Sequence, residues 1–362
     1  MVGGVPLVTV MGTPRTIGDS LGLRLKARIQ VLAHYLSEQI AAGSMLSGRA
    51  LRTPRDIREV IRPHLANLGT LEPGLAMELE AMAGAAEVSL EDLLIIQGYT
   101  DLLSTNGSHA PSTPSTFVGC SAEQTQNGKA CQMLLWEADP ALLPYVTLLH
   151  RIPAHGPASL SLTLAGLHPI AVLNEAGIAV TSNTLLVNDS ASYGHFTTHI
   201  VASLATAPSY DDALHRAQAG PRWGGRAIHL LASSGERASI ELSGSRTAIL
   251  PDQMRNAPRV HTNHPLDEHI QPVGRSDDFS RVRLENLAAT VVRAKAVHPA
   301  EMLQWFGLAN SATGPSRHES TARQRRGSIT NPDACIALYL DPAERLLYLR
   351  RGPGTGLDAK RL

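Results

Sequence analysis

Cys120 is the residue of this chain whose sequence context best suits covalent chemistry. It follows Gly119 and a polar, Pro- and Ser-rich run over residues 108–116, which predicts an exposed loop. A cysteine at the junction of a loop and a rigid strand could cleave the peptide bond that precedes it. The cysteine would then be the new N-terminal residue and could act as a nucleophile. The competing interpretation is a small buried hydrophobic side chain, which is what most lone cysteines are.

Cys120 is expected to open the first strand of a hairpin. Residues 120–126 and 129–136 predict two strands. Asn127-Gly128 between them is typical of a two-residue type I′ turn, because both central residues need a positive φ. Cys131 on the second strand and Cys335 in an apolar run are expected in the core. The spacing of the three cysteines predicts neither a disulfide framework nor a Cys-x-x-Cys metal site.

The elements that must position this hairpin divide the chain into a helical first third and a strand-rich remainder. A strand at 7–10 and helices at 16–42, 54–67, 72–86 and 89–103 are predicted before it. Strands are predicted at 145–152, 159–167, 170–173, 178–186, 227–232, 238–242, 246–250, 335–340 and 346–349. Further helices are expected at 196–206, 210–219, 276–293 and 300–308, and a surface loop at 311–326. Runs of strands interrupted by blocks of helices predict an α+β fold in which helices cover two antiparallel sheets.

Composition is that of an ordinary globular protein. The 362 residues are 43% hydrophobic, enough for one large domain or two ordinary ones. The 32 basic and 32 acidic side chains leave no net charge to attract nucleic acid or an anionic membrane. The N-terminus lacks the basic and apolar regions of a signal peptide, and no run of about 18 apolar residues occurs. The expected location is therefore the cytoplasm, with no membrane partner.

Several short motifs, in order along the chain, resemble those of the acyl-CoA:isopenicillin N acyltransferase type of N-terminal nucleophile hydrolase. They are a helix, turn and helix at 78–94, Gly119-Cys120, Trp136-Glu137, Asn-Glu-Ala-Gly-Ile-Ala-Val-Thr-Ser-Asn at 174–183, Thr-Asn-His at 262–264, Ser280-Arg281 with Arg283-Leu284, and the closing hairpin from residue 334. The resemblance implies a four-layer αββα sandwich. Residues 1–119 would be a helical N-terminal segment and residues 120–362 the catalytic segment, together one globular unit.

The same resemblance implies self-cleavage between Gly119 and Cys120. The freed α-amine of Cys120, with a pKa of about 8, would act as the base for the thiol of the same residue. The thiolate would attack a small-molecule amide or thioester, with acyl-CoA among the expected substrates, and water or an amine would then take the acyl group. Whether the enzyme hydrolyses or transfers is left open. No cofactor is expected, and the two cleaved chains are expected to stay together.

Three other residues take roles by family position. Asn263 would donate its side-chain amide to the tetrahedral oxyanion, with Asn183 as a second polar group at the acyl site. Arg281 matches an arginine that reaches into the site and holds carboxylates near the nucleophile. The alternative for an arginine on a helix surface is simple solvation.

The carboxylate near the nucleophile is the imperfect match. The family prefers Asn-Trp-Asp on the second hairpin strand, whereas this chain has Leu135-Trp136-Glu137. Glu137 is therefore the expected counterpart, and Asp139 takes that place if the strand contains a bulge. Such a carboxylate would orient the α-ammonium and tune its pKa.

Two other functions stay open. The departure from Asn-Trp-Asp could mark an uncleaved relative that binds a small molecule or serves as a scaffold. A conventional cysteine hydrolase could instead use a histidine such as His264 as base. His195 with His199, and His261 with His264, have neither a nearby third ligand nor an H-E-x-x-H pattern, so no metal is predicted.

Overall fold

The computed structural model describes residues 1–43, 45–46, 49–50, 53–65, 68, 73–103, 114–189, 194–252, 258–274, 278–292, 297–298, 303, 335–352 and 357–362. The helix predicted at 300–308, apart from residue 303, and the loop predicted at 311–326 lie outside these residues.

The larger sheet has eight strands in the order β1-β6-β7-β8-β9-β10-β11-β12. Their bounds are β1 (Leu7–Gly12), β6 (Val146–Pro153), β7 (Ser159–Leu164), β8 (Ala171–Asn174), β9 (Ile178–Thr184), β10 (Arg226–Ala232), β11 (Arg237–Leu242) and β12 (Thr247–Ile249). All eight were expected from the sequence. The expectation of purely antiparallel pairing was wrong for β1, which pairs parallel with β6. The helices between these two strands supply the long crossover that a parallel pair requires.

The smaller sheet has the order β13-β4-β5-β14-β15-β16. Its strands are β13 (Arg259–His261), β4 (Ser115–Cys120), β5 (Cys131–Glu137), β14 (Cys335–Asp341), β15 (Leu346–Arg351) and β16 (Asp358–Arg361). The short strands β13 and β16 were not predicted.

Strand β4 corrects the predicted hairpin. The strand begins at Ser115, inside the segment predicted as loop, and Cys120 is its last residue rather than its first. A short 3₁₀ helix, η1 (Ala122–Gln124), follows, so the connection to β5 is longer than the predicted two-residue turn. Gly128 still has the positive φ of 67° expected for a turn glycine. The β-branched and aromatic residues at 116–118 favour a strand, but the serines and prolines around them masked that signal.

Seven helices of the described chain surround the sheets. They are α1 (Pro14–Gly43), α2 (Pro54–Leu65), α4 (Pro73–Ala86), α5 (Leu90–Leu103), α6 (Thr197–Ala205), α7 (Tyr210–Gln218) and α8 (Asp278–Val291). The remaining short elements are β2 (Met45–Leu46), β3 (Arg49–Ala50), η2 (Pro140–Tyr145) and η3 (Gln271–Val273). Ser89 caps α5 as predicted, because its Oγ accepts a hydrogen bond from the Asp92 amide at 3.0 Å.

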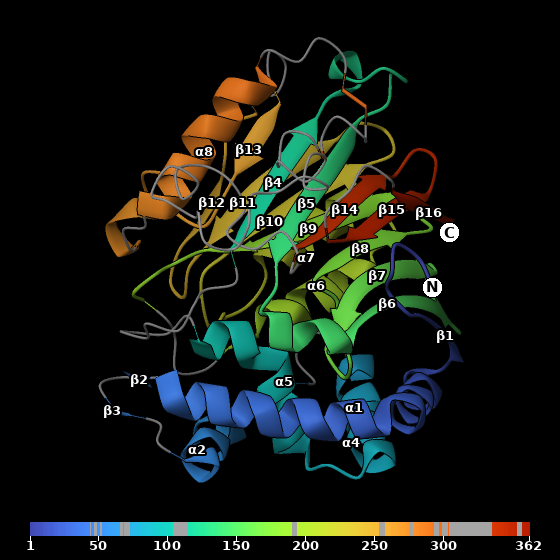
Figure 1. The fold of residues 1–362 in the computed structure, drawn as a ribbon, viewed down its shortest axis with the longest axis vertical. Coiled ribbons are helices and arrows are strands. Elements are labelled where there is room, and N and C mark those ends of the chain that lie inside the picture. The colour runs from blue at the N-terminus through green and yellow to red at the C-terminus, as the bar shows by residue number, and fades with distance from the viewer. Residues whose placement is uncertain are drawn as a thin grey trace, which may run out of the picture.

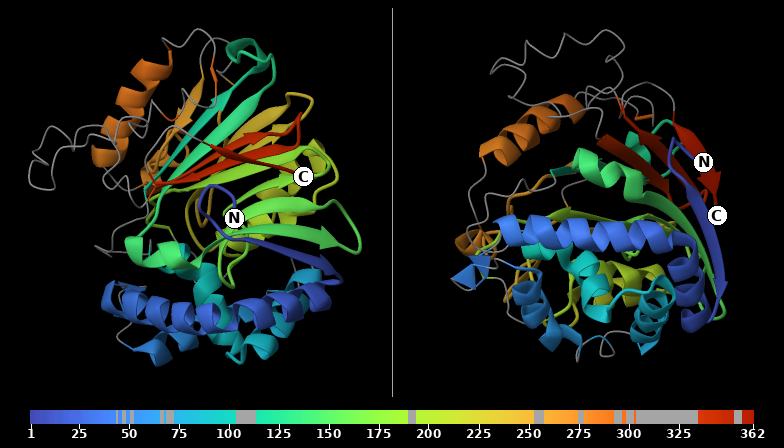
Figure 2. Two further views of the ribbon diagram at one scale, coloured as in Figure 1. Left: turned by 45° about the vertical axis from the view of Figure 1, so that its right-hand side comes forward. Right: turned by 60° about the horizontal axis from the view of Figure 1, so that its bottom comes forward.

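The two sheets face each other, and each carries helices on its other side (Figures 1 and 2). The Phe117 ring of β4 stacks on the His229 ring of β10 with centroids 3.6 Å apart. Apolar residues of α6 and α7 share a core cluster with β8 to β11, and those of α8 share one with β4, β5 and β14. The N-terminal helices α1, α2, α4 and α5 lie across one end of the sheets (Figure 1).

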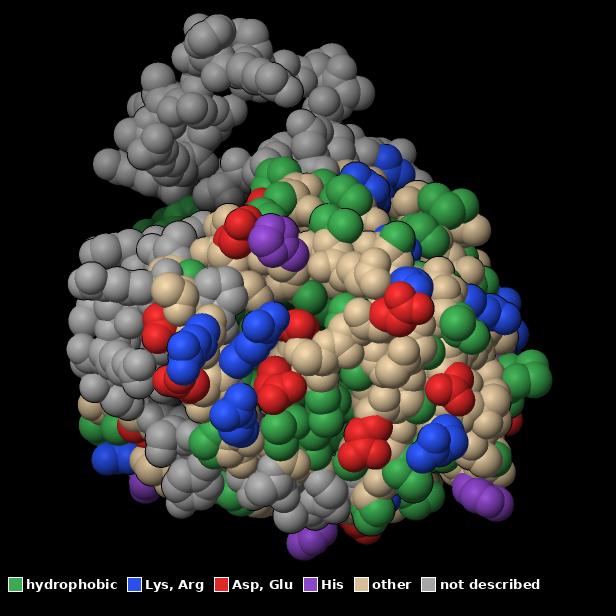
Figure 3. Space-filling model, turned by 90° about the horizontal axis from the view of Figure 1, so that it is seen from below, with side chains coloured by type: hydrophobic (Ala, Val, Ile, Leu, Met, Phe, Trp, Pro, Cys, Tyr) green, Lys and Arg blue, Asp and Glu red, His purple; other side chains and the backbone are tan. Residues whose placement is uncertain are grey.

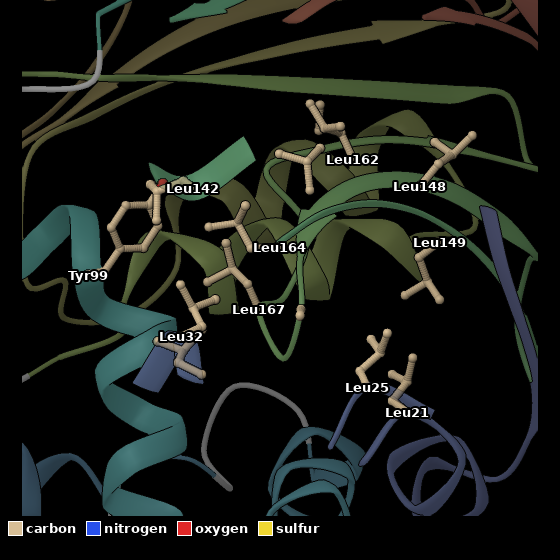
Figure 4. Packing of buried hydrophobic residues seen from close by; sticks show 14 of the residues in the cluster. Leu21, Leu25, Leu32, Tyr99, Leu142, Leu148, Leu149, Leu162, Leu164 and Leu167 are labelled. Atoms are coloured by element: carbon tan, nitrogen blue, oxygen red, sulfur yellow. The ribbon is translucent and has the colours of Figure 1, made fainter. Parts of the chain in front are cut away.

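The largest core cluster joins the N-terminal helices to the larger sheet. Leucines of α1 face leucines of β6 and β7 across it (Figure 4). On the outer face of these helices, basic and acidic side chains are interspersed (Figure 3), with pairs such as Lys26–Glu87 at 2.6 Å and Arg58–Asp92 at 2.6 Å. Within the described ranges, no helix combines the length and the apolar character that crossing a bilayer requires.

Candidate active site

Ser115, the first residue of β4, lies at the centre of a buried polar cluster. Asn263, just after β13, donates from Nδ2 to Ser115 Oγ at 3.2 Å and to the Thr184 carbonyl of β9 at 2.9 Å. In return, the Ser115 amide donates to Asn263 Oδ1 at 3.2 Å. Ser115 is 3% exposed and Asn263 is 1% exposed. Residues from both sheets therefore meet where β4 begins.

Arg283 of α8 fixes the orientation of the Asn263 amide. Its Nη2 donates to Asn263 Oδ1 at 2.6 Å, and its Nη1 donates to the Ser115 carbonyl at 3.2 Å and to Thr116 Oγ1 at 2.8 Å. Because a guanidinium can only donate, the atom facing it must be Oδ1, which turns Nδ2 toward Ser115. The charge-assisted bond also polarises the amide and strengthens Nδ2 as a donor.

The helical phase of α8 explains why Arg283 is in the cluster and Arg281 is not. Ser280, Arg283, Leu287 and Val291 are buried and follow one face of the helix, whereas Arg281 is exposed. Ser280 also contacts Asn263, because its Oγ accepts a hydrogen bond from the backbone N–H of Asn263 at 2.8 Å. Arg283 therefore lies in the polar cluster, whereas Arg281, to which the resemblance assigned a role at the site, is exposed. The inward spacing of 284, 287 and 291 was the signal that could have identified Arg283.

A cavity of ≈ 20 Å³, room for about one water molecule, adjoins the cluster. Its lining includes Tyr99 of α5, Ser115, Trp136, Leu167 and Ile170. The wall also contains the buried Arg226, whose guanidinium donates to Thr197, Thr184 and Thr100 at 2.7 to 3.0 Å. This arginine ties α5 and α6 to the larger sheet beside the cavity. Burial raises the pKa of its neighbour Asp101, an effect that Arg226 and Thr197 partly offset.

Cys120 lies at the other end of β4, five residues or roughly 17 Å of extended chain from Ser115. It pairs directly with Cys131 of β5, is 1% exposed, and belongs to the apolar cluster beneath α8. A hydrogen bond with Cys131 and burial raise the pKa of the Cys120 thiol well above its usual value, opposite to what a thiolate nucleophile needs. A cavity of ≈ 550 Å³ lies nearby but is lined by Ser121 rather than by Cys120.

Asn183 lies between the two sheets and is fully buried. Its Oδ1 accepts from His229 Nε2 at 3.2 Å, and His229 Nδ1 lies 2.9 Å from Ser239 Oγ. Among the residues that the structure describes, its Nδ2 has no hydrogen-bond partner. Asn183 precedes Thr184, so it adjoins the Ser115 cluster along β9 without hydrogen bonding to Asn263.

Glu137 lies at the Ser115 end of β5. It is 4% exposed, and its amide donates to the Pro114 carbonyl at 2.8 Å. Residues 131–136 pair with β4 in unbroken register, so no bulge moves Asp139 into that position. Asp139 caps η2 and accepts from the Tyr35 hydroxyl at 2.9 Å. Burial and this hydrogen bond raise the pKa of Tyr35 to about 12.

The predicted site residues therefore divide into two groups. Asn263 and Glu137 meet near Ser115, with Asn183 close along β9, while Cys120 is distant and Arg281 faces solvent. The structure does not bring Cys120 together with Asn263. Sequence reasoning missed Ser115, Arg283 and Thr184.

His199, His261 and His264 are buried. His264 Nδ1 lies 2.8 Å from Ser280 Oγ, and His261 Nε2 lies 2.8 Å from Glu241 Oε1. The ring of His199 lies 5.6 Å from that of His168. Within the described part of the chain, no three His, Cys, Asp or Glu side chains form a group suited to a metal ion.

Residues 153–306 match the family model of acyl-coenzyme A:6-aminopenicillanic acid acyl-transferase, which confirms the resemblance seen in the sequence. The matched segment contains Asn183, Asn263 and Arg283, whereas Ser115 and Cys120 precede it.

Similar solved structures include the following two. A mutant of conjugated bile acid hydrolase from Clostridium perfringens has a TM-score of 0.47 and 10% identity, covering 68% of this chain and 92% of that chain. Penicillin V acylase from Agrobacterium tumefaciens has a TM-score of 0.38 and 16% identity, covering 68% and 86%. No curated protein sequence matches the chain.

Proposed function

We propose that this protein is a self-processing amidohydrolase or acyltransferase with the four-layer αββα sandwich of N-terminal nucleophile enzymes. The observation that carries the proposal is the Asn263 amide, held by Arg283 so that Nδ2 points at the start of β4. A preorganised amide donor in a water-poor site is what a developing oxyanion requires. The substrate class is a small-molecule amide or thioester, acyl-CoA included, and the acyl group passes to water or to an amine.

The nucleophile is assigned by sequence to Cys120, after a cut at Gly119–Cys120 that would separate residues 1–119 from 120–362. This assignment stays a prediction. The burial of the Cys120 thiol and its raised pKa do not support it. The proposal of self-processing does not depend on this assignment, because a cut before either end residue of β4, Ser115 or Cys120, would create a new N-terminus.

Acyl transfer is tested with Asn263→Ala. Purified protein would be incubated with a panel of N-acyl amides and with short-chain acyl-CoA, and amine or CoA release would be followed. Loss of the donor is expected to lower the rate by about 100- to 1000-fold. Asn127→Ala, on the turn after η1, is the matched control and is expected to keep the wild-type rate. A folded wild type that stays uncut and turns over neither substrate class would instead favour a binding or scaffold protein.

A further inference from the structure

We infer that Ser115, not Cys120, is the nucleophile, and that the chain cuts itself between Pro114 and Ser115. The inference rests on the proposed function and names the reacting atom within it. Ser115 is the first residue of β4, so a cut before it would leave a strand that starts with a hydroxyl side chain and a free α-amine. Nucleophile and base would then be on one residue.

Three contacts of Ser115 are those that such a nucleophile needs. Its Oγ lies 3.2 Å from Asn263 Nδ2, so the same N–H is near enough to donate to the oxyanion, which forms two bonds away from Oγ on the acyl carbon. Its backbone nitrogen lies 3.2 Å from Asn263 Oδ1, which would orient the freed amine. The Arg283 guanidinium lies 3.2 Å from its carbonyl, and a cation so close favours the neutral, basic form of that amine.

The bond to be cut is itself held in place. The Pro114 carbonyl, which would be attacked, accepts a hydrogen bond from the Glu137 amide at 2.8 Å. This donor is fixed by β5, because Trp136 pairs with Ser115 in the register of the sheet. A rigid N–H aimed at the carbonyl oxygen stabilises the negative charge that develops there during attack. Cys120 instead pairs with Cys131.

The self-cleavage step balances with water as its only co-reactant. Ser115 Oγ attacks the Pro114 carbonyl carbon, the C–N bond breaks, and the hydroxyl proton goes to the leaving nitrogen. The product is an ester between Pro114 and Ser115. Water hydrolyses that ester, which gives a Pro114 carboxylate, a free hydroxyl and the α-amine. In turnover the α-amine of Ser115 takes the Oγ proton, Oγ bonds the substrate acyl carbon, and the substrate's amine or thiol leaves with that proton. Water or an acceptor amine then attacks the acyl ester, the acyl group passes to it, and Oγ regains a proton.

The experiment compares the full-length wild type with the variants Ser115→Ala, Ser115→Cys and Ser121→Ala. Intact mass under denaturing conditions shows whether each chain is cut, and N-terminal sequencing of the second fragment shows where. The wild type is expected to give a chain that begins at Ser115. Ser115→Ala should remain whole, Ser115→Cys should be cut at the same bond, and Ser121→Ala, a buried serine at the opposite end of the hairpin, should be cut like the wild type.

Circular dichroism would establish that each variant is folded. The Ser115→Cys variant tests position 115 even if the Ser115→Ala variant does not fold. An added thiol reagent should block cleavage of the Ser115→Cys chain, because its nucleophile is then a thiol. A second fragment that begins at Cys120, or a Ser115→Ala protein that is still cut, would overturn the assignment to Ser115 while leaving the proposed function standing. A folded wild type that is never cut would overturn both.

Discussion

At the scale of single residues, the site depends on one amide with all its hydrogen-bonding groups engaged. Asn263 uses Oδ1 toward Ser115 and Arg283, and Nδ2 toward Ser115 and Thr184. An amide without the arginine could rotate by 180° and exchange its donor for an acceptor. The charge on Arg283 therefore acts through Asn263 and does not itself need to touch the substrate.

Arg283→Gln is expected to lower acyl-transfer activity by about 100-fold or more, because the donor is no longer held toward the nucleophile. Arg283→Lys should recover little of it, since an ammonium cannot reproduce the planar fork that spans Asn263, Ser115 and Thr116. Steady-state rates are the measurement. Arg281→Gln, on the exposed side of α8, should retain the wild-type rate, and a loss there would favour the sequence-based assignment instead.

At the scale of elements, close helix packing sets where the N-terminal helices lie. Gly18 and Gly22 of α1 face α4 so tightly that an added Cβ at Gly18 would collide with the Glu78 carbonyl oxygen, and one at Gly22 would lie 2.5 Å from that of Met82. Small residues at i and i+4 let the two helices approach. Glu78 is thereby placed to pair with Arg151 of β6.

Gly22→Ala is accordingly expected to destabilise the protein by about 1–3 kcal/mol, because the α4 backbone must move to admit the methyl group. The matched control is Gly84→Ala on α4, where a Cβ would meet nothing within 4 Å. That change should be neutral or stabilise by up to about 1 kcal/mol through the helix propensity of alanine. Urea unfolding of both variants is the measurement, and equal effects at the two positions would contradict the packing argument.

The sequence predicted the eight strands of the larger sheet and the long helices with repeated apolar positions. The beginning of β4 was missed because Pro114 and Ser115 read as loop residues, although both flank a buried β-branched and aromatic run. Asn263 and Glu137, which the sequence proposed as site residues, lie beside Ser115 and Pro114. Ser115 itself was not considered, because it fell in the segment predicted as loop.

At the scale of the whole molecule, buried histidines couple stability to pH. His168 is 3% exposed, and burial, followed by the charge of Arg151, lowers its pKa to about 3. The carboxylate of Glu78 lies 3.9 Å away, and the His199 ring faces it at 5.6 Å. Because the folded-state pKa is below the unfolded value of about 6.5, the unfolded chain binds more protons as pH falls through that value.

The protein should therefore lose about 2 kcal/mol of stability from His168 alone between pH 7 and pH 5. Denaturant unfolding at the two pH values measures this. His168→Gln should reduce the difference, whereas His34→Gln, on the exposed side of α1, should leave it unchanged. A variant and wild type with the same pH dependence would show that His168 is not buried as a neutral imidazole.

Under the proposed self-cleavage, the parallel pairing of β1 with β6 has a further consequence. Once the peptide bond is broken, Leu7–Gly12 remains an edge strand of the larger sheet without covalent linkage to the strand beside it. The cleaved protein would then be a heterodimer of its own two halves. Its folded population obeys mass action, so dilution weakens the mature form but not the intact precursor.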